Sequence, residues 1–470
     1  MRPMSGKRVG LAAAVFVSGC SAADHQASLD RVHADVSDRA AVAVDWRAET
    51  DGREAVEAIV VAKLAGEMTV DDAVAVSLLK NPTLRALYRE LGVAESDIVA
   101  AGLPENPVFT VGRRFRGQAA EYDVMQEFVS IFLIPLRRRI AENAFEQARL
   151  RVTHDLLDHT AEVREAYFKL QAAEQTAEMR RSVADAMDAS LEAARALRAA
   201  GNTTALDVAQ EARAANRARL DFADAEYAVI DGRERLNVLL GLWGEETRWT
   251  VPSRLADLPD EESLPGELER RAVTDRLDLA SLRAEIEALG QTLGMTRITS
   301  LIPQLTLGGH SEREPEGTNT AGPSLEIPVP IFNYGQAARA RARALLLEAQ
   351  DRYAALAIKV RSEVRLASSR MALARRRVEF YKRAVLPVQQ TVTDQTQVRY
   401  NGMLLGVFQL LQAKQEQIDA GRDYIQALAE YWTARAELEK AIGRRLPTGP
   451  LRPSTLGEPK AETTMMHHHN

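Results

Sequence analysis

The sequence predicts a mostly α-helical protein that also contributes strands to a membrane β-barrel, and three observations lead to this fold class. The 470-residue chain is internally duplicated, because the order of signals in residues 68–243 returns over residues 268–446. Each copy contains two short strand-like segments. Each copy also contains a helical pattern far longer than an ordinary globular core uses. The chain is therefore expected to form one architecture with internal pseudo-symmetry.

The duplication is clearest in the long helical patterns. Their apolar residues recur every seven positions, and each has an apolar counterpart about 201 residues later. The matched residues are Val163, Leu170, Ala177, Ala184 and Leu191 in the first copy and Val364, Met371, Val378, Val385 and Val392 in the second. A seven-residue spacing along a narrow, Ala-rich stripe predicts coiled-coil packing against neighbouring helices.

The N-terminus carries an export signal. Residues 1–19 combine three basic residues with an apolar run that is too short to span a bilayer as a helix. The run closes at Val17-Ser18-Gly19-Cys20, which resembles the bacterial lipobox, and Cys20 is the only cysteine. We predict a lipoprotein signal peptide and attachment of fatty-acyl chains such as palmitate at Cys20. Ser21, in place of Asp, implies sorting to the outer membrane. The alternative is an ordinary signal peptide whose cleavage site contains a cysteine.

The first elements after the signal are short. Residues 20–67 are polar, Ala-rich and weakly patterned, which predicts an extended leader with some helix. Thr69 is placed to cap a short helix over residues 70–79. Asn81-Pro82 then separates this helix from a second, amphipathic one that ends at Gly102.

A hairpin of two strands follows in each copy. The strands are expected at about 107–116 and 122–134, and again at about 303–311 and 320–330. About ten residues is the length that a tilted, bilayer-spanning strand requires. Apolar and polar residues alternate in the last strand, with Pro323, Leu325, Ile327 and Val329 on one face and Ser324 and Glu326 on the other. This alternation is typical of a barrel wall. The alternative is an edge hairpin of a soluble sheet.

The long helices come next. They are expected at about 136–200 and 203–242 in the first copy and at about 335–400 and 404–446 in the second. Gly201 and Gly402 break the two patterns and predict the turns of two helical hairpins. About 60 helical residues without interruption would extend about 90 Å. Residues 244–267, rich in Pro and acidic residues, are expected to connect the copies, and residues 447–470 to form a mobile tail.

Four strands cannot close a barrel around a lumen, and open sheet edges are not stable in lipid. The chain is therefore expected to oligomerise, so that copies of it complete the wall. Three copies would supply about twelve strands, enough for a conduit, although the residues alone do not determine the number three.

The duplicated layout, the lipobox, Asn81-Pro82 and the strand-to-helix junctions at Ile134-Pro135-Leu136 and Val329-Pro330-Ile331-Phe332 resemble the TolC-like outer-membrane efflux channel family. The resemblance covers about residues 60–446. It implies a homotrimer with a twelve-stranded outer-membrane β-barrel and a periplasmic α-helical tunnel. It also implies two partners: a periplasmic adaptor and an inner-membrane pump of the resistance-nodulation-division type. Arg137-Arg138-Arg139 is most similar to the branch linked to heavy-metal and copper resistance.

The family carries a Gly-x-x-x-x-Val/Leu-Asp-Val turn at the periplasmic tip, and residues 201–208 fit this pattern. The resemblance assigns adaptor docking to Gly201, Asn202, Thr203, Thr204, Asn401 and Gly402. It assigns the tunnel aperture to Asp207, Gln210, Phe408, Gln409, Leu411 and Gln412. The chain departs from the family here, because Phe408 and Leu411 stand where well-studied members have acidic residues. The alternative for Asp207 is an ordinary first-turn acid stabilised by the helix dipole.

No catalytic constellation, phosphate-binding loop or dinucleotide motif is found, so neither catalysis nor a cofactor or bound metal is expected. The net charge of −6, with basic and acidic residues interspersed, argues against nucleic acid as a partner. His154 and His159 are off the spacing for chelation, and packing roles are expected for them. The terminal Met465-Met466-His467-His468-His469 could bind soft metal ions or serve no function.

The function expected from these features is that of a passive, lipid-anchored exit duct in the outer membrane that extends into the periplasm and conducts small toxic compounds or metal ions. A type I protein-secretion duct would use the same fold, so it remains an alternative. A periplasmic adaptor lipoprotein is a weaker alternative, because it would contain one helical hairpin and not two equivalent halves.

Overall fold

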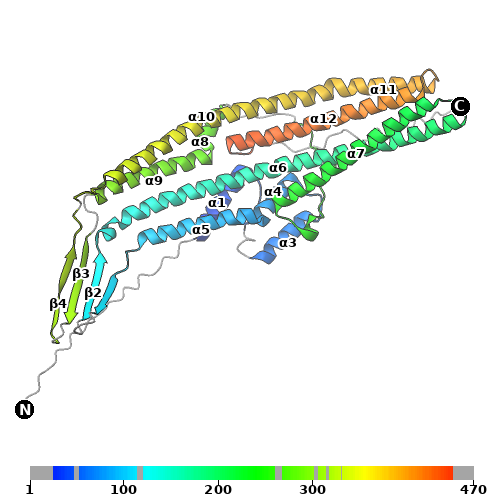
Figure 1. The fold of residues 1–470 in the computed structure, drawn as a ribbon. Helices are drawn as coiled ribbons and strands as arrows, with labels where there is room; N and C mark the ends of the chain where they lie inside the picture. Colours follow the sequence, from blue (N-terminus) through cyan, green and yellow to red (C-terminus); the bar gives the residue numbers. More distant parts are fainter. Residues whose placement is uncertain are drawn as a thin grey trace, which may run out of the picture.

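The computed structural model describes residues 25–46, 52–113, 120–259, 267–300, 305–313, 317–329 and 331–447. The predicted signal peptide, Cys20 and the terminal Met/His residues lie outside these ranges. Two strand hairpins, one from each copy, join into a single four-stranded sheet at one end of the molecule (Figure 1). The strands are β1 (Val108–Arg113), β2 (Ala120–Glu127), β3 (Thr306–Arg313) and β4 (Asn319–Glu326). Every neighbouring pair is antiparallel, and β1 and β4 form the two edges.

Helices make up the rest of the described chain and extend away from the sheet (Figure 1). The leader contains α1 (His25–Ala40) and α3 (Arg53–Leu64). The first copy contains α4 (Val70–Lys80), α5 (Pro82–Gly102), α6 (Val129–Ala199) and α7 (Ala205–Leu240), and the connector begins with the 3₁₀ turn η1 (Gly244–Thr247). The second copy contains α8 (Leu268–Asp275), α9 (Leu277–Thr299), α10 (Gln336–Phe380), the π-helical turn η2 (Tyr381–Val385), α11 (Leu386–Asn401) and α12 (Val407–Ile442). No helix within the described ranges combines the length and the apolar composition needed to cross a bilayer.

The helices form one long layer. α6 runs along its whole length, as do α10 and α11 together (Figure 1). α5 and α7 lie end to end beside α6, and α9 and α12 lie end to end beside α10. In the half farther from the sheet the order across the layer is α7, α6, α12, α10, which leaves α7 and α10 as its edges.

The two end-to-end joints follow the same design. In the first, Gly241 ends α7 with a φ of 73° and lies so close to Asn81 that a Cβ there would be 2.7 Å from the Asn81 Cα. The Asn81 side chain caps α5 and also donates from Nδ2 to the Leu239 carbonyl at 2.8 Å. Glycine is required here because the left-handed conformation and the close approach both exclude a side chain. The positive end of the α5 dipole thus faces the negative end of α7.

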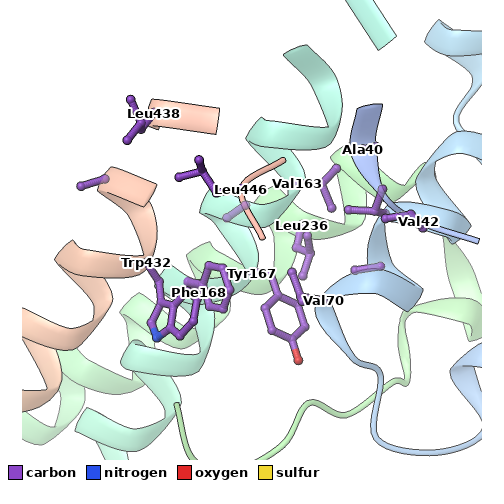
Figure 2. Packing of buried hydrophobic residues seen from close by; sticks show 14 of the residues in the cluster. Ala40, Val42, Val70, Val163, Tyr167, Phe168, Leu236, Trp432, Leu438 and Leu446 are labelled. Carbon is purple, nitrogen blue, oxygen red and sulfur yellow. The ribbon is translucent and has the colours of Figure 1, made fainter. Parts of the chain in front are cut away.

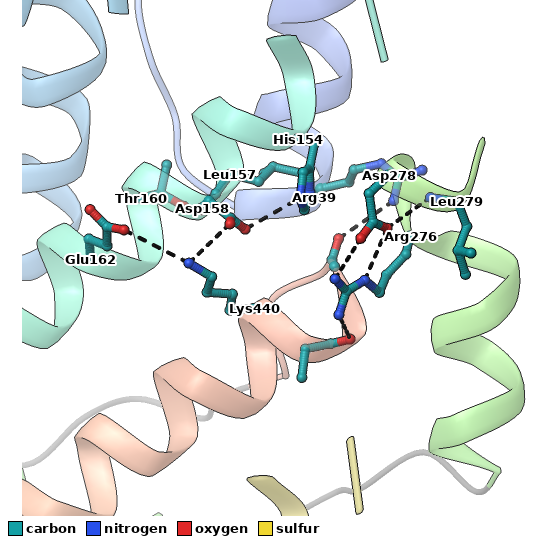
Figure 3. A network of polar contacts seen from close by, with 12 residues as sticks. Arg39, His154, Leu157, Asp158, Thr160, Glu162, Arg276, Asp278, Leu279 and Lys440 are labelled. Carbon is teal, nitrogen blue, oxygen red and sulfur yellow. Dashed lines mark hydrogen bonds and ion pairs between the residues drawn. The ribbon is translucent and has the colours of Figure 1, made fainter. Parts of the chain in front are cut away.

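In the second joint, Gly443 ends α12, also with a φ of 73°, and Arg276 takes the place of the asparagine. Arg276 pairs with Asp278 at 2.6 Å and donates to the Ala441 carbonyl at 3.3 Å (Figure 3). Figure 3 also shows Lys440 between Asp158 and Glu162 of α6, at 3.0 and 3.8 Å. The Arg276 contacts join α9 to α12 within the second copy, and the Lys440 contacts hold the second copy against the first.

The main core lies where α1, α4 and the ends of α7 and α12 meet α6 (Figure 2). Phe168 stacks on Trp432 with ring centroids 5.2 Å apart, and the Tyr167 hydroxyl donates to the Met68 carbonyl at 2.8 Å. A buried ion pair joins Arg164 to Glu439 at 3.2 Å, and burial lowers the pKa of Arg164. The helices found in the leader, α1 and α3, agree with the expectation of partial helix.

The second strand is shorter than predicted. It was expected to continue to residue 134, but β2 ends at Glu127 and α6 begins at Val129. The Glu127 carboxylate accepts hydrogen bonds from the Val129 and Ser130 amides at 3.1 and 2.7 Å, so it caps the helix about two turns earlier than the pattern indicates. Pro135 lies inside α6, where it was expected to end the strand. The apolar run before it reads as a strand but folds as the first two turns of a helix.

Other boundaries shift less. β4 ends at Glu326, before the predicted 330, and β3 extends to Arg313, beyond the predicted 311. The predicted helix at 335–400 is divided by the π-helical turn, and the helix predicted at 404–446 runs from Val407 to Ile442. Residues 114–116, 303, 304, 330 and 448–470, which belong to predicted strands or to the tail, lie outside the described ranges.

The π-helical turn also corrects the predicted register between the copies. Val163 and Leu170 match Val364 and Met371 as expected, and all four are buried. Beyond the turn the offset increases by one, because Ala205 and Leu240 correspond to Val407 and Ile442, 202 residues apart in both cases. A π turn takes up one extra residue without rotating the helix faces that follow.

Two predicted counterparts are therefore wrong. Leu191 is matched by Thr393, which is fully buried, whereas the predicted Val392 is 42% exposed. Likewise Leu386 replaces Val385 as the match of Ala184. The inserted turn ends two residues before Pro387, which has no N–H to donate to the preceding helical turn.

Candidate transport conduit and its tips

The register of the sheet gives its two faces opposite chemistry. Directly paired residues share a face, and residues two apart along a strand share it too. One face carries Phe109, Val111, Tyr122, Val124, Leu307, Pro323 and Leu325. The other carries Glu121, Asp123, Glu127, His310, Glu312, Ser324 and Glu326. The alternation predicted for the last strand is present, and across the sheet it separates an apolar face from an acidic one.

The acidic face contains a close polar pair. His310 Nδ1 lies 2.6 Å from Asp123 Oδ1, and the two residues are direct partners in the β2–β3 ladder. Among the described strand residues this face carries no lysine or arginine. It is therefore suited to water and to cations.

The helical layer also has two different faces. The connector lies along one of them: Gln171 Nε2 donates to the Pro252 carbonyl at 2.9 Å, and Trp432 Nε1 donates to the Ala256 carbonyl at 2.8 Å. The opposite face is hollowed into a cavity of about 530 Å³ between α6, α7, α10 and α12. Its floor is rich in alanine, and two ion pairs one heptad apart line it, Arg370–Glu437 at 3.2 Å and Arg377–Glu430 at 2.6 Å. This open face is the candidate tunnel wall.

The first hairpin tip is held by polar contacts. Gly201 takes the left-handed conformation with a φ of 78°, and the Asn202 amide donates back to the Leu197 carbonyl at 2.8 Å. Thr204 and Asp207 then form a capping box at the start of α7. The Asp207 Oδ2 atom accepts from the Thr203 hydroxyl at 2.8 Å, the Thr204 hydroxyl at 2.7 Å and the Thr204 amide at 2.9 Å. These bonds from Thr204, with the one from Thr203, lower the pKa of Asp207.

The second tip has the same backbone path and different side chains. Met403 occupies the left-handed position with a φ of 58°, and the Leu404 amide donates to the Arg399 carbonyl at 2.9 Å. Met403 is 94% exposed and Leu404 76% exposed. Gly406 is the N-cap of α12 and has no side chain to cap it. The tip is therefore apolar and is held by backbone hydrogen bonds.

The structure places the predicted tip and aperture residues in different surroundings. Asn202, Gln210, Asn401, Gly402, Gln409 and Gln412 are exposed, whereas Asp207, Phe408 and Leu411 are half-buried. Leu411 packs with Val208 against a small core between α6 and α7. Gln412 donates to Glu416 at 3.1 Å, and both are on α12. The carboxylate of Asp207 accepts its hydrogen bonds from Thr203 and Thr204 of its own turn, which agrees with the alternative of a structural first-turn acid.

Sequence reasoning missed an ion-pair network that links the two copies above the tips. Arg180 of α6 lies 3.2 Å from Asp419 of α12 and 3.9 Å from Asp221 of α7. Arg422 lies 3.6 Å from Asp419. The sequence has no local signal for these pairs, because Arg180 and Asp419 belong to different copies and come together only when α6 packs against α12.

The histidines have structural surroundings. His159 Nε2 lies 2.6 Å from the Ser77 hydroxyl and 3.0 Å from the Leu239 carbonyl, and burial lowers its pKa. This agrees with the packing role expected for it. In the described part of the chain, no three His, Cys, Asp or Glu side chains converge on a position that could hold a metal ion.

Comparison with known proteins identifies the class. The model of the outer membrane efflux protein family matches residues 74–242 and 268–444, which correspond to the two copies. The chain is 24% identical over 389 residues to the cobalt-zinc-cadmium resistance protein CzcC of Cupriavidus metallidurans, covering 81% of this chain and 91% of that protein.

Two solved structures share the fold. The Campylobacter jejuni CmeC outer membrane channel has a TM-score of 0.68 at 15% identity, over 80% of this chain and 85% of that one. A membrane protein from Pseudomonas aeruginosa has a TM-score of 0.67 at 18% identity, over 79% of this chain and 93% of that one.

A duplicated strand hairpin and helical hairpin, with an acidic sheet face and a hollowed helical face, define a channel wall. The chain belongs to the outer membrane efflux protein family. It is an outer-membrane channel of tripartite efflux that extends into the periplasm, and the family membership confirms the predictions of channel function and of a non-enzymatic protein.

Proposed function

We propose that this channel is a lipid-anchored homotrimer that releases divalent transition-metal cations from a tripartite efflux system. The metal-resistance name of the relative that matches 81% of this chain supports the choice of substrate. The observation that carries the proposal is the acidic face of the sheet. It contributes Glu121, Asp123, Glu127, Glu312 and Glu326 from each chain, and the described strand residues of this face include no lysine or arginine. Such a lining concentrates cations and repels anions.

Reversal potentials of the purified trimer in planar bilayers test this lining. With a salt gradient, the wild-type channel should favour cations. The substitutions Asp123→Asn, Glu312→Gln and Glu326→Gln together should reduce this preference, and the same number of substitutions on the helical surface, Glu54→Gln, Glu57→Gln and Glu287→Gln, should not. An anion-selective or non-selective wild-type channel would contradict the proposal.

The substrate itself is tested in cells. A strain lacking the gene should become sensitive to cobalt, zinc or cadmium, and the wild-type gene should restore growth. If deletion instead blocks release of a secreted protein and leaves metal tolerance unchanged, the alternative of a type I secretion duct would be correct.

In the proposed trimer, each subunit would contact its neighbours through the free edges of its sheet and of its helical layer. β1 and β4 are the free edges of the sheet, and three copies would join them into about twelve strands. α7 and α10 are the edges of the helical layer and both expose apolar side chains. These are Leu220, Tyr227 and Val238 on α7 and Leu366, Leu373 and Phe380 on α10. Leu373→Glu or Tyr227→Glu should lower the trimer fraction in native mass spectrometry, whereas Glu226→Gln should not.

The partners in this proposal are a periplasmic adaptor at the tips and an inner-membrane pump of the resistance-nodulation-division type. Docking would involve Gly201, Asn202, Thr203, Thr204, Asn401 and Gly402. Cysteines at Asn202 or Asn401, in a Cys20→Ser background, should cross-link to the adaptor in intact cells. A cysteine at Asp97, which lies on α5 in the half of the molecule near the sheet, is the negative control and should not cross-link to the adaptor.

The aperture would be formed near Asp207, Gln210, Phe408, Gln409, Leu411 and Gln412. Phe408→Ala with Leu411→Ala should raise the conductance of the closed channel, and an unchanged conductance would remove these residues from the aperture. Lipid attachment at Cys20 is tested by mass spectrometry of the mature N-terminus, where a diacylated cysteine is expected and an unmodified one would contradict the anchor.

A further inference from the structure

One row of the sheet carries two arginines on its apolar face. Arg113 pairs with Ala120, Ala120 pairs with Arg313, and Arg313 pairs with Asn319, so the four side chains lie side by side on one face. Two residues farther along each strand, the same face carries Val111, Tyr122, Ser311 and Ala321. The arginine row therefore caps an apolar surface at the last described residues of the strands.

The orientation of the molecule places this row toward the cell exterior. The row lies at the end of the sheet away from the helices (Figure 1), and the helices extend into the periplasm. Rows on one face of a strand are about 6.8 Å apart. The arginine row is thus about 20 Å from the row of Leu307 and Leu325, close to the height of the apolar band of a membrane barrel. Tyr122 lies directly below it, as aromatic residues do at a membrane interface.

The charges of the two arginines are not used within the described part of the protein. Arg113 and Arg313 are both exposed, and neither forms a hydrogen bond or ion pair with another described residue. Glu312 precedes Arg313 in the sequence and pairs with Glu121 in the ladder, but both carboxylates point to the opposite face of the sheet. At the edge of a lipid-facing surface, the long arginine side chains reach the level of the headgroups, where the anionic groups of the lipid are available as partners.

The geometry suits a phosphate group. Arg113 and Arg313 are two strands apart, about 10 Å between their Cα atoms, and the small side chain of Ala120 lies between them. Long arginine side chains can converge over a methyl group, and guanidinium groups bind phosphate with two parallel hydrogen bonds. The Asn319 amide, next in the row, adds a donor.

We propose that Arg113, Arg313 and Asn319 form a docking site for the phosphate groups of a phosphorylated glycolipid in the outer leaflet. The site recognises a lipid, because the apolar row beneath it contacts the acyl chains while the arginines hold the headgroup. A closed trimer has three such sites around its rim. The site depends on the membrane orientation of the channel and is independent of the substrate that the channel conducts.

Native mass spectrometry of the purified, full-length trimer tests this proposal. The probes are a bis-phosphorylated lipid A, the same lipid after enzymatic removal of its phosphates, and phosphatidylcholine. The wild-type trimer should retain bis-phosphorylated lipid A preferentially, with up to three tightly bound molecules. Each arginine replaced by glutamine should weaken this binding about tenfold, since a hydrogen bond to a charged group is lost.

The double variant Arg113→Gln, Arg313→Gln should bind all three lipids alike. The variant Arg113→Lys, Arg313→Lys should bind with intermediate affinity, because it keeps the charge and loses the paired hydrogen bonds. The matched control Arg195→Gln, Arg198→Gln removes the same charge from exposed positions near the end of α6 and should bind as the wild type does. The same spectra report whether each variant is a trimer, and the single variants replace the double one if it is not.

The proposal is overturned if the double variant retains bis-phosphorylated lipid A as tightly as the wild type. It is also overturned if the wild type binds the dephosphorylated lipid equally well, or if inorganic phosphate at the same concentration displaces the lipid completely. None of these outcomes depends on metal transport. The lipid-binding test therefore remains interpretable even if the channel does not conduct metal ions.

Discussion

The two hairpin tips follow one backbone path with opposite side-chain chemistry. Gly201 and Met403 both take the left-handed conformation, and in both tips the next amide donates to a carbonyl of the preceding helix. Thr204 caps the first tip, whereas Gly406 leaves the second uncapped. The turn is thus set by backbone hydrogen bonds, and the side chains are free to differ. The first tip is polar and locked, and the second is apolar and open to a partner.

The helices that lead to the tips differ in the same direction. α6 runs through 71 residues as one α-helix, whereas its counterpart is divided by the π-helical turn Tyr381–Val385. The turn absorbs one inserted residue and returns Thr393 to the buried face. The second copy therefore combines an uncapped tip with an interrupted helix. We expect both features to make its helical hairpin less stable than that of the first copy.

The largest effect is expected from single-residue deletions in these two helices. Deleting Ala186 should cost about 5 kcal/mol of unfolding free energy or more, because α6 has no π turn to absorb the change and Met187 and Leu191 would leave the core. Deleting Ala384 in a Pro387→Ala background should cost about 1 kcal/mol or less, because it turns the π turn into α-helix and keeps Thr393 buried. Thermal unfolding of the two trimers, followed by circular dichroism, measures the difference.

Equal losses from the two deletions would contradict the assignment of the insertion to Tyr381–Val385. The substitution Pro387→Ala alone is the control for the second variant. It should leave stability nearly unchanged if the turn is set by the extra residue.

The next effect separates the two helix joints. Gly241→Ala should destabilise by about 3 kcal/mol, because a left-handed alanine costs about 1 kcal/mol and its Cβ would meet the Asn81 backbone. Gly443→Ala should cost only about 1 kcal/mol. The nearest atom to its Cβ would be the flexible Cγ of Arg276, at 3.4 Å. Chemical denaturation of both variants gives the two free energies, and a larger loss at Gly443 would reverse our ranking of the joints.

These differences also show how far the sequence could be read. Seven-residue apolar spacing and repeated order predicted the hairpins and long helices, because both are local periodic signals. The π turn was missed because a constant offset of 201 residues still pairs Ala184 and Leu191 with apolar residues, Val385 and Val392. These valines lie one position before the true counterparts, so the one-residue insertion left no gap in the apolar pattern. The end of β2 was missed because Phe128–Pro135 is apolar enough for a strand, and only the contact of Glu127 with the Val129 and Ser130 amides decides for helix.

The site was less predictable than the fold. The tip motif located Asp207, but the motif cannot show that its carboxylate is used within the turn. The acidic sheet face and the arginine row depend on the pairing of β2 with β3, which joins strands about 190 residues apart and has no local signal. Pairing across the repeat was needed before either surface could be recognised.

A smaller effect is expected from exchanging the caps. Asp207→Ala should raise amide hydrogen exchange at residues 205–208, because the capping box is lost. Gly406→Thr with Gln409→Asp should slow exchange at the start of α12 by a similar factor, since a Cβ at position 406 lies near only the side chain at position 409. Asp224→Ala, an exposed acid within α7, is the control and should change neither tip. If the added cap leaves α12 unchanged, the missing cap does not explain the difference between the tips.

The smallest effect is a difference in pH response between the tips. Hydrogen bonds from Thr204 and Thr203 lower the pKa of Asp207 from its usual value of 3.8, so the folded turn favours the ionised form. The resulting stabilisation is fully present above pH 3.8 and is lost as the pH falls through the lower pKa of the folded turn. The corresponding residue in the second tip, Gln409, does not titrate. Amide exchange at residues 205–208, corrected for its intrinsic pH dependence, should therefore speed up below pH 3.8, while exchange at residues 407–410 should not. The variant Asp207→Asn should abolish the response of the first tip, and a persisting response would assign it to another group.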